Sequence, residues 1–211
     1  MLELYSYFRS SAAYRVRIAL NHKGIEHKIK PVNLVAAEQR SDDYLRLNPA
    51  GLVPTLKLAN GDTISQSSAI IEWLEESYPA APKLLPEDSL AKAKVRALTH
   101  SIACDIHPLN NLRVLNYLTA ELDVTAAQKT NWYHHWLKQG FDALEIALSQ
   151  GPYALGGKPS MLDLYLVPQV YNALRFELDM TDYPKILAAY SACNKLDAFI
   201  DAAPQNQVDA T

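Results

Sequence analysis

The sequence predicts a protein of two parts, an α/β domain built on a small mixed sheet and an all-α helical domain. In the first eighty residues the apolar positions change repeatedly between a period of two, typical of strands, and spacings of three and four, typical of helices. Prolines then recur at Pro79, Pro82 and Pro86, and beyond them the spacing is helical throughout. We therefore expect domains at residues 1–80 and 88–211, joined by a linker at 81–87.

The first domain is expected to contain a strand, a helix, a strand, a short helix, a hairpin and a final helix. The expected segments are 2–7, 11–23, 28–32, 42–47, the hairpin strands 55–58 and 63–65, and a helix that Ser67 caps and that ends before Tyr78. Gly24 is a typical helix stop, Pro31 favours an edge or a strand end, and Asn60-Gly61 favours a hairpin turn. A right-handed crossover makes the first two strands parallel, and the hairpin adds antiparallel strands beside them.

The second domain is expected to be a helical bundle. Helical spacing covers residues 89–118 and 126–148, and a last helical stretch runs from Pro184 to about Ala203. Between them, Ser160 and Asp163 have the spacing of a capping box that opens a helix through Phe176.

Composition excludes several classes of protein. Lys and Arg number 20 against 23 Asp and Glu, which leaves a net charge of −3 and argues against a nucleic-acid clamp or a polybasic membrane anchor. The two cysteines, Cys104 and Cys193, are too few for a disulfide framework or a cysteine zinc site, and we expect both to be buried thiols. Adjacent His134 and His135 face different directions on a helix, so no metal site is expected there. The first residues lack the basic and apolar regions of a signal peptide, and the chain is expected to be cytoplasmic.

Three loops carry the candidate chemistry. Ser10 and Ser11 lie between the first strand and the first helix, where a helix N-terminus stabilises an anion such as a thiolate or carboxylate, although a serine there can equally be a plain N-cap. Val53-Pro54 precedes a strand; a trans bond at a strand start is the simpler interpretation, and a cis bond would expose the Val53 backbone to an extended peptide. Gln66-Ser67 begins the next helix, where a carboxylate site and a simple cap are both open.

Several segments, taken together and in order, resemble the zeta class of glutathione S-transferases. They are SSAAYRVRIAL (10–20), LNP (47–49), VPTL (53–56), QSSAIIEWL (66–74), IHPLNNL (106–112) and residues 160–169. The match runs over nearly the whole chain, and the segment 106–112 looks closest to bacterial members, which include maleylpyruvate isomerases. The resemblance implies a thioredoxin-like N-terminal domain, a helical C-terminal domain, glutathione as the cofactor and a homodimer.

The resemblance also implies a role for each matching residue. Ser10 and Ser11 hold or polarise the sulfur of glutathione, Val53 pairs with its cysteinyl backbone beside cis-Pro54, and Gln66 and Ser67 bind its γ-glutamyl carboxylate and amine. The tripeptide site is completed by Gln39, His107 and Asn111. The chain departs from many zeta enzymes in having Ala12 where they have cysteine. That departure excludes a thiol reaction at this position, but it leaves isomerisation intact because the nucleophile is the sulfur of glutathione.

The activity that the resemblance implies is the isomerisation of a cis diketo dicarboxylic acid, maleylacetoacetate or maleylpyruvate, to its fumaryl isomer in tyrosine and aromatic catabolism. Such an enzyme lowers the pKa of the thiol from about 8.5 and binds two carboxylates. We expect Arg9 and Arg175 to bind them, because guanidinium groups match carboxylates with two parallel hydrogen bonds. The alternative for Arg175 is an ion pair with Glu177 or Asp179. Arg113 is a third candidate, with a plain surface position as its alternative.

Two other functions remain open at this point. A transferase or peroxidase acting on hydrophobic electrophiles needs apolar walls in place of the two arginines. A non-catalytic binding module has no need to retain Ser11, Val53-Pro54 and Gln66-Ser67 together. The residues do not distinguish maleylacetoacetate from maleylpyruvate, nor do they show which of Ser10 and Ser11 faces the sulfur.

Overall fold

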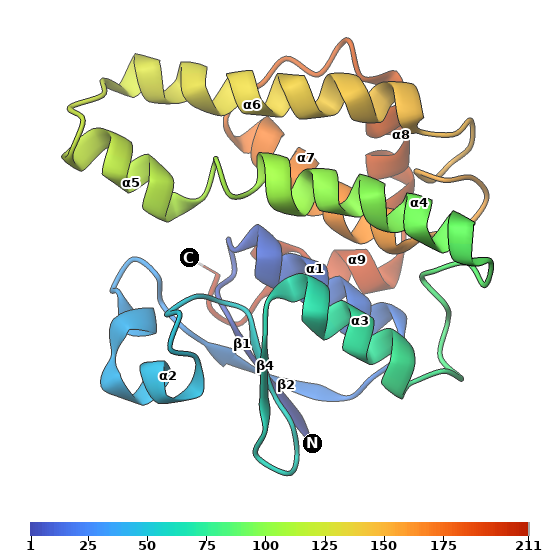
Figure 1. Cartoon of the computed structure of the whole chain (residues 1–211), viewed down its shortest axis with the longest axis horizontal. Coiled ribbons are helices and arrows are strands. Elements are labelled where there is room, and N and C mark those ends of the chain that lie inside the picture. Colours follow the sequence, from blue (N-terminus) through green and yellow to red (C-terminus); the bar gives the residue numbers. More distant parts are fainter. Residues whose placement is uncertain (211) are drawn as a thin grey trace. The chain divides into compact units, whose positions relative to one another are not determined.

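The computed structural model describes residues 1–210, and within them one four-stranded mixed sheet has the strand order β2-β1-β3-β4 (Figure 1). The strands are β1 (Leu2–Ser6), β2 (His27–Pro31), β3 (Thr55–Lys57) and β4 (Thr63–Ser65). β1 pairs with β2 in parallel and with β3 antiparallel, and β3 pairs antiparallel with β4. The predicted parallel pair, the hairpin and the edge position of the strand that ends at Pro31 are confirmed.

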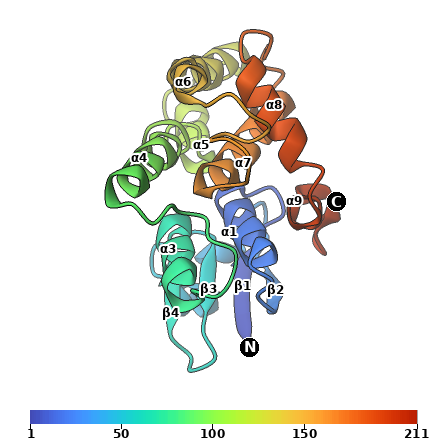
Figure 2. The same ribbon diagram turned by 90° about the vertical axis from the view of Figure 1, so that its right-hand side faces the viewer.

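Two compact units make up the described chain. Residues 1–83 form the first unit together with residues 194–210, and Leu84–Cys193 form the second. The helices of the first unit are α1 (Ser11–His22), α2 (Asp42–Leu47) and α3 (Ser67–Ser77), with a 3₁₀ turn at Glu38–Arg40. α1 and α3 pack side by side (Figure 2). Gly24 follows α1 with φ +65°, which confirms the predicted glycine stop.

The C-terminal residues depart from the predicted domain of 88–211, because residues 194–210 pack with the first unit. The stretch expected as one helix is two, α8 (Pro184–Cys193) and α9 (Asp197–Ala202), followed by a 3₁₀ turn at Pro204–Asn206. α9 packs on α1, where Tyr14 Oη donates to the Phe199 carbonyl at 3.5 Å and Arg17 Nε donates to the Ala202 carbonyl at 2.9 Å. These contacts use polar side chains of α1, so its apolar spacing could not reveal them.

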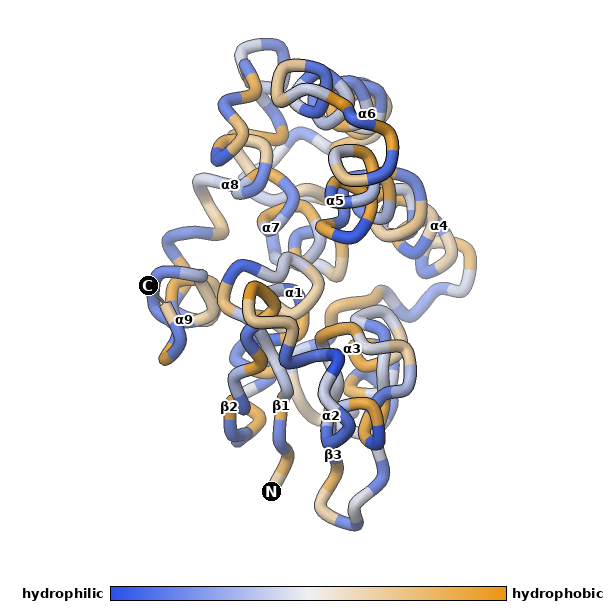
Figure 3. The backbone as a smooth tube through the Cα atoms, turned by 90° about the vertical axis from the view of Figure 1, so that its left-hand side faces the viewer, coloured by the Kyte–Doolittle hydropathy of each residue, from blue (hydrophilic) through white to orange (hydrophobic). Residues whose placement is uncertain are grey.

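The second unit is helical, as predicted. Its helices are α4 (Ser89–His100), α5 (Leu112–Ala120), α6 (Ala126–Ala147), α7 (Met161–Arg175) and α8, with a π-helical segment at Ser101–Ile106. The helix expected over 89–118 is therefore interrupted before α5. α7 is buried without a break from Met161 to Val170 and packs on α4 and α8. Hydrophilic and hydrophobic residues alternate along the helices that surround it (Figure 3).

The capping box at the start of α7 is confirmed. Asp163 is fully buried, and its Oδ2 accepts hydrogen bonds from the Ser160 amide and hydroxyl, both at 2.8 Å. Its Oδ1 accepts from the Ala154 amide at 2.9 Å, which ties the preceding loop to the helix. Burial raises the pKa of this carboxyl, and the hydrogen bonds that it accepts oppose that shift. Asp163 is thus a structural residue of the second unit.

The two cysteines differ in exposure. Cys193 is buried, as expected, and burial raises its pKa. The same expectation for Cys104 is wrong, because this residue is exposed in the π-helical segment, between the buried Ile102 and Ile106 in the sequence. None of the described helices is both long enough and apolar enough to cross a membrane.

Candidate functional site

Strand register brings the three candidate loops of the first unit to one edge of the sheet. Tyr5 near the end of β1 pairs with Thr55 at the start of β3, and Thr55 pairs with Ser65 at the end of β4. The loop before α1, the Val53-Pro54 loop and the Gln66-Ser67 loop adjoin these three paired residues. The site is therefore assembled from chain turns at one sheet edge, and the backbone groups of such turns are not used by the sheet itself.

In the loop before α1, the two serines occupy different positions. Ser10 is the N-cap, since its Oγ accepts from the Ala13 amide at 3.2 Å, which confirms the capping interpretation for one serine. Ser11 is the first residue of the helix and is buried. The amide of Ala12 has no hydrogen-bond acceptor within residues 1–210. Together with the positive end of the helix dipole, this amide and the serine hydroxyls provide donors for an anion.

The Val53-Pro54 peptide bond is cis, whereas the residues alone favoured a trans bond; the cis bond agrees with the resemblance. In the part of the chain that the structure describes, neither the amide nor the carbonyl of Val53 has a hydrogen-bonding partner. Both groups can therefore pair with an extended peptide.

A buried polar network holds this loop from below. Tyr44 Oη donates to the Leu52 carbonyl at 2.6 Å and lies 3.0 Å from Thr55 Oγ1. Asn48 Nδ2 donates to the same two oxygens, at 2.8 and 3.1 Å. Burial raises the pKa of Tyr44, so its hydroxyl keeps its proton at neutral pH and remains a donor. The residues on either side of Val53-Pro54 are thus fixed by the side chains of Tyr44 in α2 and of Asn48, which directly follows that helix.

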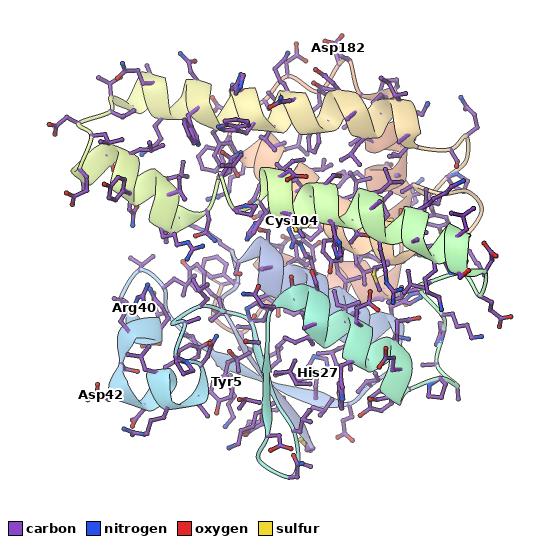
Figure 4. The ribbon with its side chains drawn as sticks, in the orientation of Figure 1. Tyr5, His27, Arg40, Asp42, Cys104 and Asp182 are labelled. Atoms are coloured by element: carbon purple, nitrogen blue, oxygen red, sulfur yellow. The ribbon has the colours of Figure 1, made fainter. Side chains whose placement is uncertain are left out.

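Gln39 lies in the 3₁₀ turn beside this loop. Its Oε1 is buried and has no partner among residues 1–210, so a ligand amine or amide could donate to it. Gly51, with φ +60°, touches the same turn: a Cβ at this position would lie 3.0 Å from the Gln39 carbonyl and 2.7 Å from Arg40 Nη1. Arg40 and the adjoining α2 segment are visible in Figure 4. The close approach at Gly51 therefore links the position of Gln39 to the Val53 loop.

Of the two interpretations left open for the third loop, the simple cap by Ser67 is not found. The N-cap of α3 is Gln66, whose backbone has φ +72° and whose side chain makes no capping hydrogen bond. A left-handed backbone in a residue with a side chain costs about 1–3 kcal/mol and is often found at binding sites. Ser67 is buried in the first turn, and Arg15 Nη1 donates to its Oγ at 3.3 Å. A helix N-terminus next to a buried guanidinium favours a carboxylate.

The other candidates lie in the second unit. Asn111 caps α5, because its Oδ1 accepts from the Arg113 amide at 3.1 Å. His107 opens the turn that connects the π-helical segment to α5 and donates its amide to the Ile102 carbonyl. α6 supports this turn, since Trp132 Nε1 donates to the Leu109 carbonyl at 2.9 Å.

The same part of α6 holds the end of α7. His134 donates to the Phe176 carbonyl at 2.7 Å, and Tyr133 stacks on the Phe176 ring at 3.9 Å between centroids. Arg175 is exposed, its Cζ lies 4.7 Å from the centre of the Phe176 ring, and the described residues give it no ion pair. The alternative pairs with Glu177 and Asp179 are therefore not formed.

Two further arginines were candidates. Arg113 is exposed in the first turn of α5, which agrees with the alternative that it is a plain surface residue. Arg9 is exposed beside Ser10, with its Cζ 4.8 Å from the centre of the Phe8 ring and no ion pair among residues 1–210. Exposed guanidinium groups without partners keep their hydrogen-bonding capacity for an anionic ligand.

Sequence reasoning missed residues that support the site. Arg15 and Arg17 are almost fully buried in α1, and Tyr44 and Asn48 are buried under the Val53 loop. A signal existed for the arginines, because two cations stood in a helix whose other residues are largely apolar. The tyrosine and asparagine carried no signal, since their partners are backbone and hydroxyl oxygens of a loop.

Comparisons with known proteins agree with one another, and the relatives cover nearly the whole chain. The family model described as the glutathione S-transferase N-terminal domain matches residues 9–77. The chain is 49% identical to the "Probable maleylacetoacetate isomerase" of Vibrio cholerae, over 99% of this chain and 98% of that protein. A holo structure of maleyl pyruvate isomerase, a bacterial zeta-class glutathione S-transferase, is 44% identical with a TM-score of 0.95, covering 99% of this chain and 100% of that one. Maleylacetoacetate isomerase from Methylobacterium extorquens AM1, with bound malonate and GSH, is 34% identical with a TM-score of 0.94, covering 99% of each chain.

The Gly51 contact gives a stability prediction with an internal control. Gly51→Ala and Gly24→Ala both place an alanine in the left-handed region, at φ +60° and +65°, and each should lose about 1 kcal/mol of unfolding free energy for that reason. Gly24 has no atom near the new Cβ, whereas at Gly51 the Gln39 carbonyl must give way even after the exposed Arg40 side chain moves aside. Gly51→Ala should therefore cost about 1 kcal/mol more, measured by denaturant unfolding. Equal losses in the two variants would show that the Gln39 turn is not held against Gly51.

Proposed function

The chain belongs to the family of zeta-class glutathione S-transferases and maleylacetoacetate isomerases, and from this premise we propose that it is a glutathione-dependent cis–trans isomerase. Its substrate is a maleyl diketo acid, maleylacetoacetate or maleylpyruvate, and its product is the fumaryl isomer. The observation that carries the proposal is the meeting of three loops at one edge of the sheet, where the Ala12 amide and both peptide groups of Val53 have no partner within residues 1–210. Malonate and GSH bound in the related isomerase support a dicarboxylate substrate and glutathione as cofactor.

The chemical groups at the sheet edge match those that glutathione needs for binding. A tripeptide needs a backbone partner, a carboxylate site and a place where its thiol ionises. The unpaired Val53 peptide groups supply the first, the N-terminus of α3 with Gln66, Ser67 and the buried Arg15 supplies the second, and the start of α1 supplies the third. Gln39 adds an unused acceptor.

Bound glutathione supplies the thiolate that adds to the carbon–carbon double bond, so that rotation about a single bond and elimination can follow. The protein has to keep that sulfur ionised near neutral pH. The Ala12 amide, the hydroxyl of Ser11 and the dipole of α1 stabilise the negative charge. Ser10 accepts the Ala13 amide, so we assign the helix cap to Ser10, and we assign the sulfur contact to Ser11, the buried first residue of the helix.

The arginines bind the two carboxylates of the substrate. Arg9 lies next to Ser10 in the first unit, and Arg175 ends α7 in the second. Both are exposed and without an ion pair among residues 1–210, so each can offer two parallel N–H donors. His107 and Asn111 are assigned to glutathione and Arg113 to the substrate with support from the family resemblance. The family also supports a homodimer and a cytoplasmic location.

The isomerase is tested by following the ultraviolet spectra of maleylacetoacetate and maleylpyruvate with the purified protein, each with and without glutathione. Turnover that requires glutathione is the expected result, and the faster substrate identifies the physiological acid. If glutathione binds and neither acid turns over, the proposal is wrong, and conjugation or peroxide reduction of small electrophiles becomes the function to test. If glutathione does not bind, a binding module is favoured.

Alanine variants of the two serines should have different effects, one on the pKa of bound glutathione and the other on stability. Ser11→Ala should raise the pKa of the bound glutathione thiol by about one unit, because a hydroxyl donor to the thiolate is lost. Ser10→Ala should leave that pKa nearly unchanged and lower the unfolding free energy by about 1 kcal/mol, because the helix cap is lost. Thiolate absorbance against pH and denaturant unfolding measure the two effects. The opposite pattern would assign the sulfur contact to Ser10.

Arg175 should matter for the substrate and not for glutathione. Arg175→Ala should lower kcat/KM for the diketo acid about 30- to 150-fold, the value of a charge-assisted pair of hydrogen bonds of about 2–3 kcal/mol. The glutathione affinity, measured by calorimetry, should stay the same. Lys158→Ala is the control, because Lys158 is an exposed cation of the same unit with no assigned role, and it should leave kcat/KM nearly unchanged. Equal losses in substrate use and glutathione affinity would remove Arg175 from its assigned role.

A further inference from the structure

We propose that Asp209, in the C-terminal segment, is a positioning residue for the sulfur site, because it fixes the backbone of the loop that leads to Ser10 and Ser11. The inference rests on the proposed function for its catalytic consequence. Its structural part, the fixing of the loop, stands on contacts inside the first unit alone.

The peptide groups of Phe8 are held from two directions. The Phe8 amide donates to Asp209 Oδ2 at 3.0 Å, across 201 residues of sequence. The Phe8 carbonyl accepts from Arg17 Nη2 at 3.1 Å. One loop residue is thus fixed by a carboxylate from the C-terminal segment and by a guanidinium from α1, and rotation of either adjoining peptide plane would break one of these bonds.

Arg17 also fixes the two residues that precede Phe8. Its side chain is almost fully buried, and Nη1 donates to Ser6 Oγ at 3.0 Å and to the Tyr7 carbonyl at 3.3 Å. Its Nε donates to the Ala202 carbonyl, which joins the loop to the C-terminal segment a second time. Burial lowers the pKa of Arg17 to about 10, so the group remains charged at neutral pH, and the nearby Asp209 carboxylate opposes that lowering.

The backbone that Arg17 and Asp209 fix leads directly into the sulfur site at Ser10 and Ser11. The Tyr7 carbonyl that accepts from Arg17 also accepts from the Ser10 amide at 2.9 Å. Arg9 lies between the clamped Phe8 and Ser10, and Ser11 follows directly. A displacement of the loop would therefore move a carboxylate-binding arginine and both serines together, and misplacement of about 1 Å can cost on the order of 100-fold in rate.

The C-terminal segment does not need Asp209 for its own conformation. Gln207 Nε2 donates to the Asp201 carbonyl at 2.8 Å and to the Ala203 carbonyl at 3.0 Å, and the Ala210 amide donates to the Gln207 carbonyl. Asp209 is only partly buried. A substitution at Asp209 should therefore release the Phe8 amide without unfolding the segment.

The test compares Asp209→Ala, Asp209→Asn and Asp201→Ala. Alanine removes the acceptor of the Phe8 amide, and asparagine keeps a neutral acceptor oxygen. Asp201 is an exposed aspartate of the same segment, and no interaction of its side chain is found within residues 1–210, so its variant is the matched control. Each variant is measured for the pKa of the bound glutathione thiol, for kcat and KM, and for amide hydrogen exchange of residues 8–13 without any ligand.

Asp209→Ala should raise the thiol pKa by about half a unit, lower kcat/KM about tenfold and speed exchange of the 8–13 amides at least tenfold. Asp209→Asn should stay close to the parent, and Asp201→Ala should match it. Loss of a negative charge alone would lower the thiol pKa, and would do so equally in the alanine and asparagine variants; that result overturns the positioning role. Parental exchange rates in Asp209→Ala also overturn it, whether or not the protein isomerises either acid.

Discussion

Helix α1 is buried on all its faces from Ser11 to Leu20, and the rest of the first unit depends on how the polar side chains of this helix are accommodated. Every residue from Ser11 to Leu20 is buried, although the helix includes Tyr14, Arg15 and Arg17. A buried cation is tolerated only when hydrogen-bond acceptors surround it. Carbonyl groups of α9 and of the loop after β1 surround Arg17, so the C-terminal segment is part of the α/β fold.

The same constraint explains why the candidate site consists largely of backbone groups. The loops at the sheet edge present peptide N–H and C=O groups and helix N-termini, which are effective only while the chain is held in place. Buried side chains hold it: Arg17 fixes the loop before α1, and Tyr44 with Asn48 fixes the loop that carries Val53. In such a site the residues behind the loops set the position of the backbone groups that would face a ligand.

This arrangement also sets how far sequence could lead. Alternating and helical periods located the strands, the hairpin and the box at Ser160–Asp163, because each of these is a local pattern. The split between α8 and α9 could not be predicted, because residues 194–196 include no glycine or proline. The positive φ of Gln66 could not be predicted either, because glutamine rarely adopts it. The bond from Phe8 to Asp209 joins chain ends that share no local pattern.

Ala12 shows what a site of this kind requires. Its side chain is buried at 9% exposure, and its contribution to the sulfur site is an amide without an acceptor in the described chain. Any residue except proline can supply that amide, so the absence of cysteine removes no group that isomerisation uses. Under the proposed function the nucleophile arrives with the cofactor, and the protein has to supply donors, a dipole and a fixed loop. Side-chain identity then matters most where it holds the backbone, at positions such as Arg17 and Tyr44, and where it meets the substrate carboxylates, at Arg9 and Arg175.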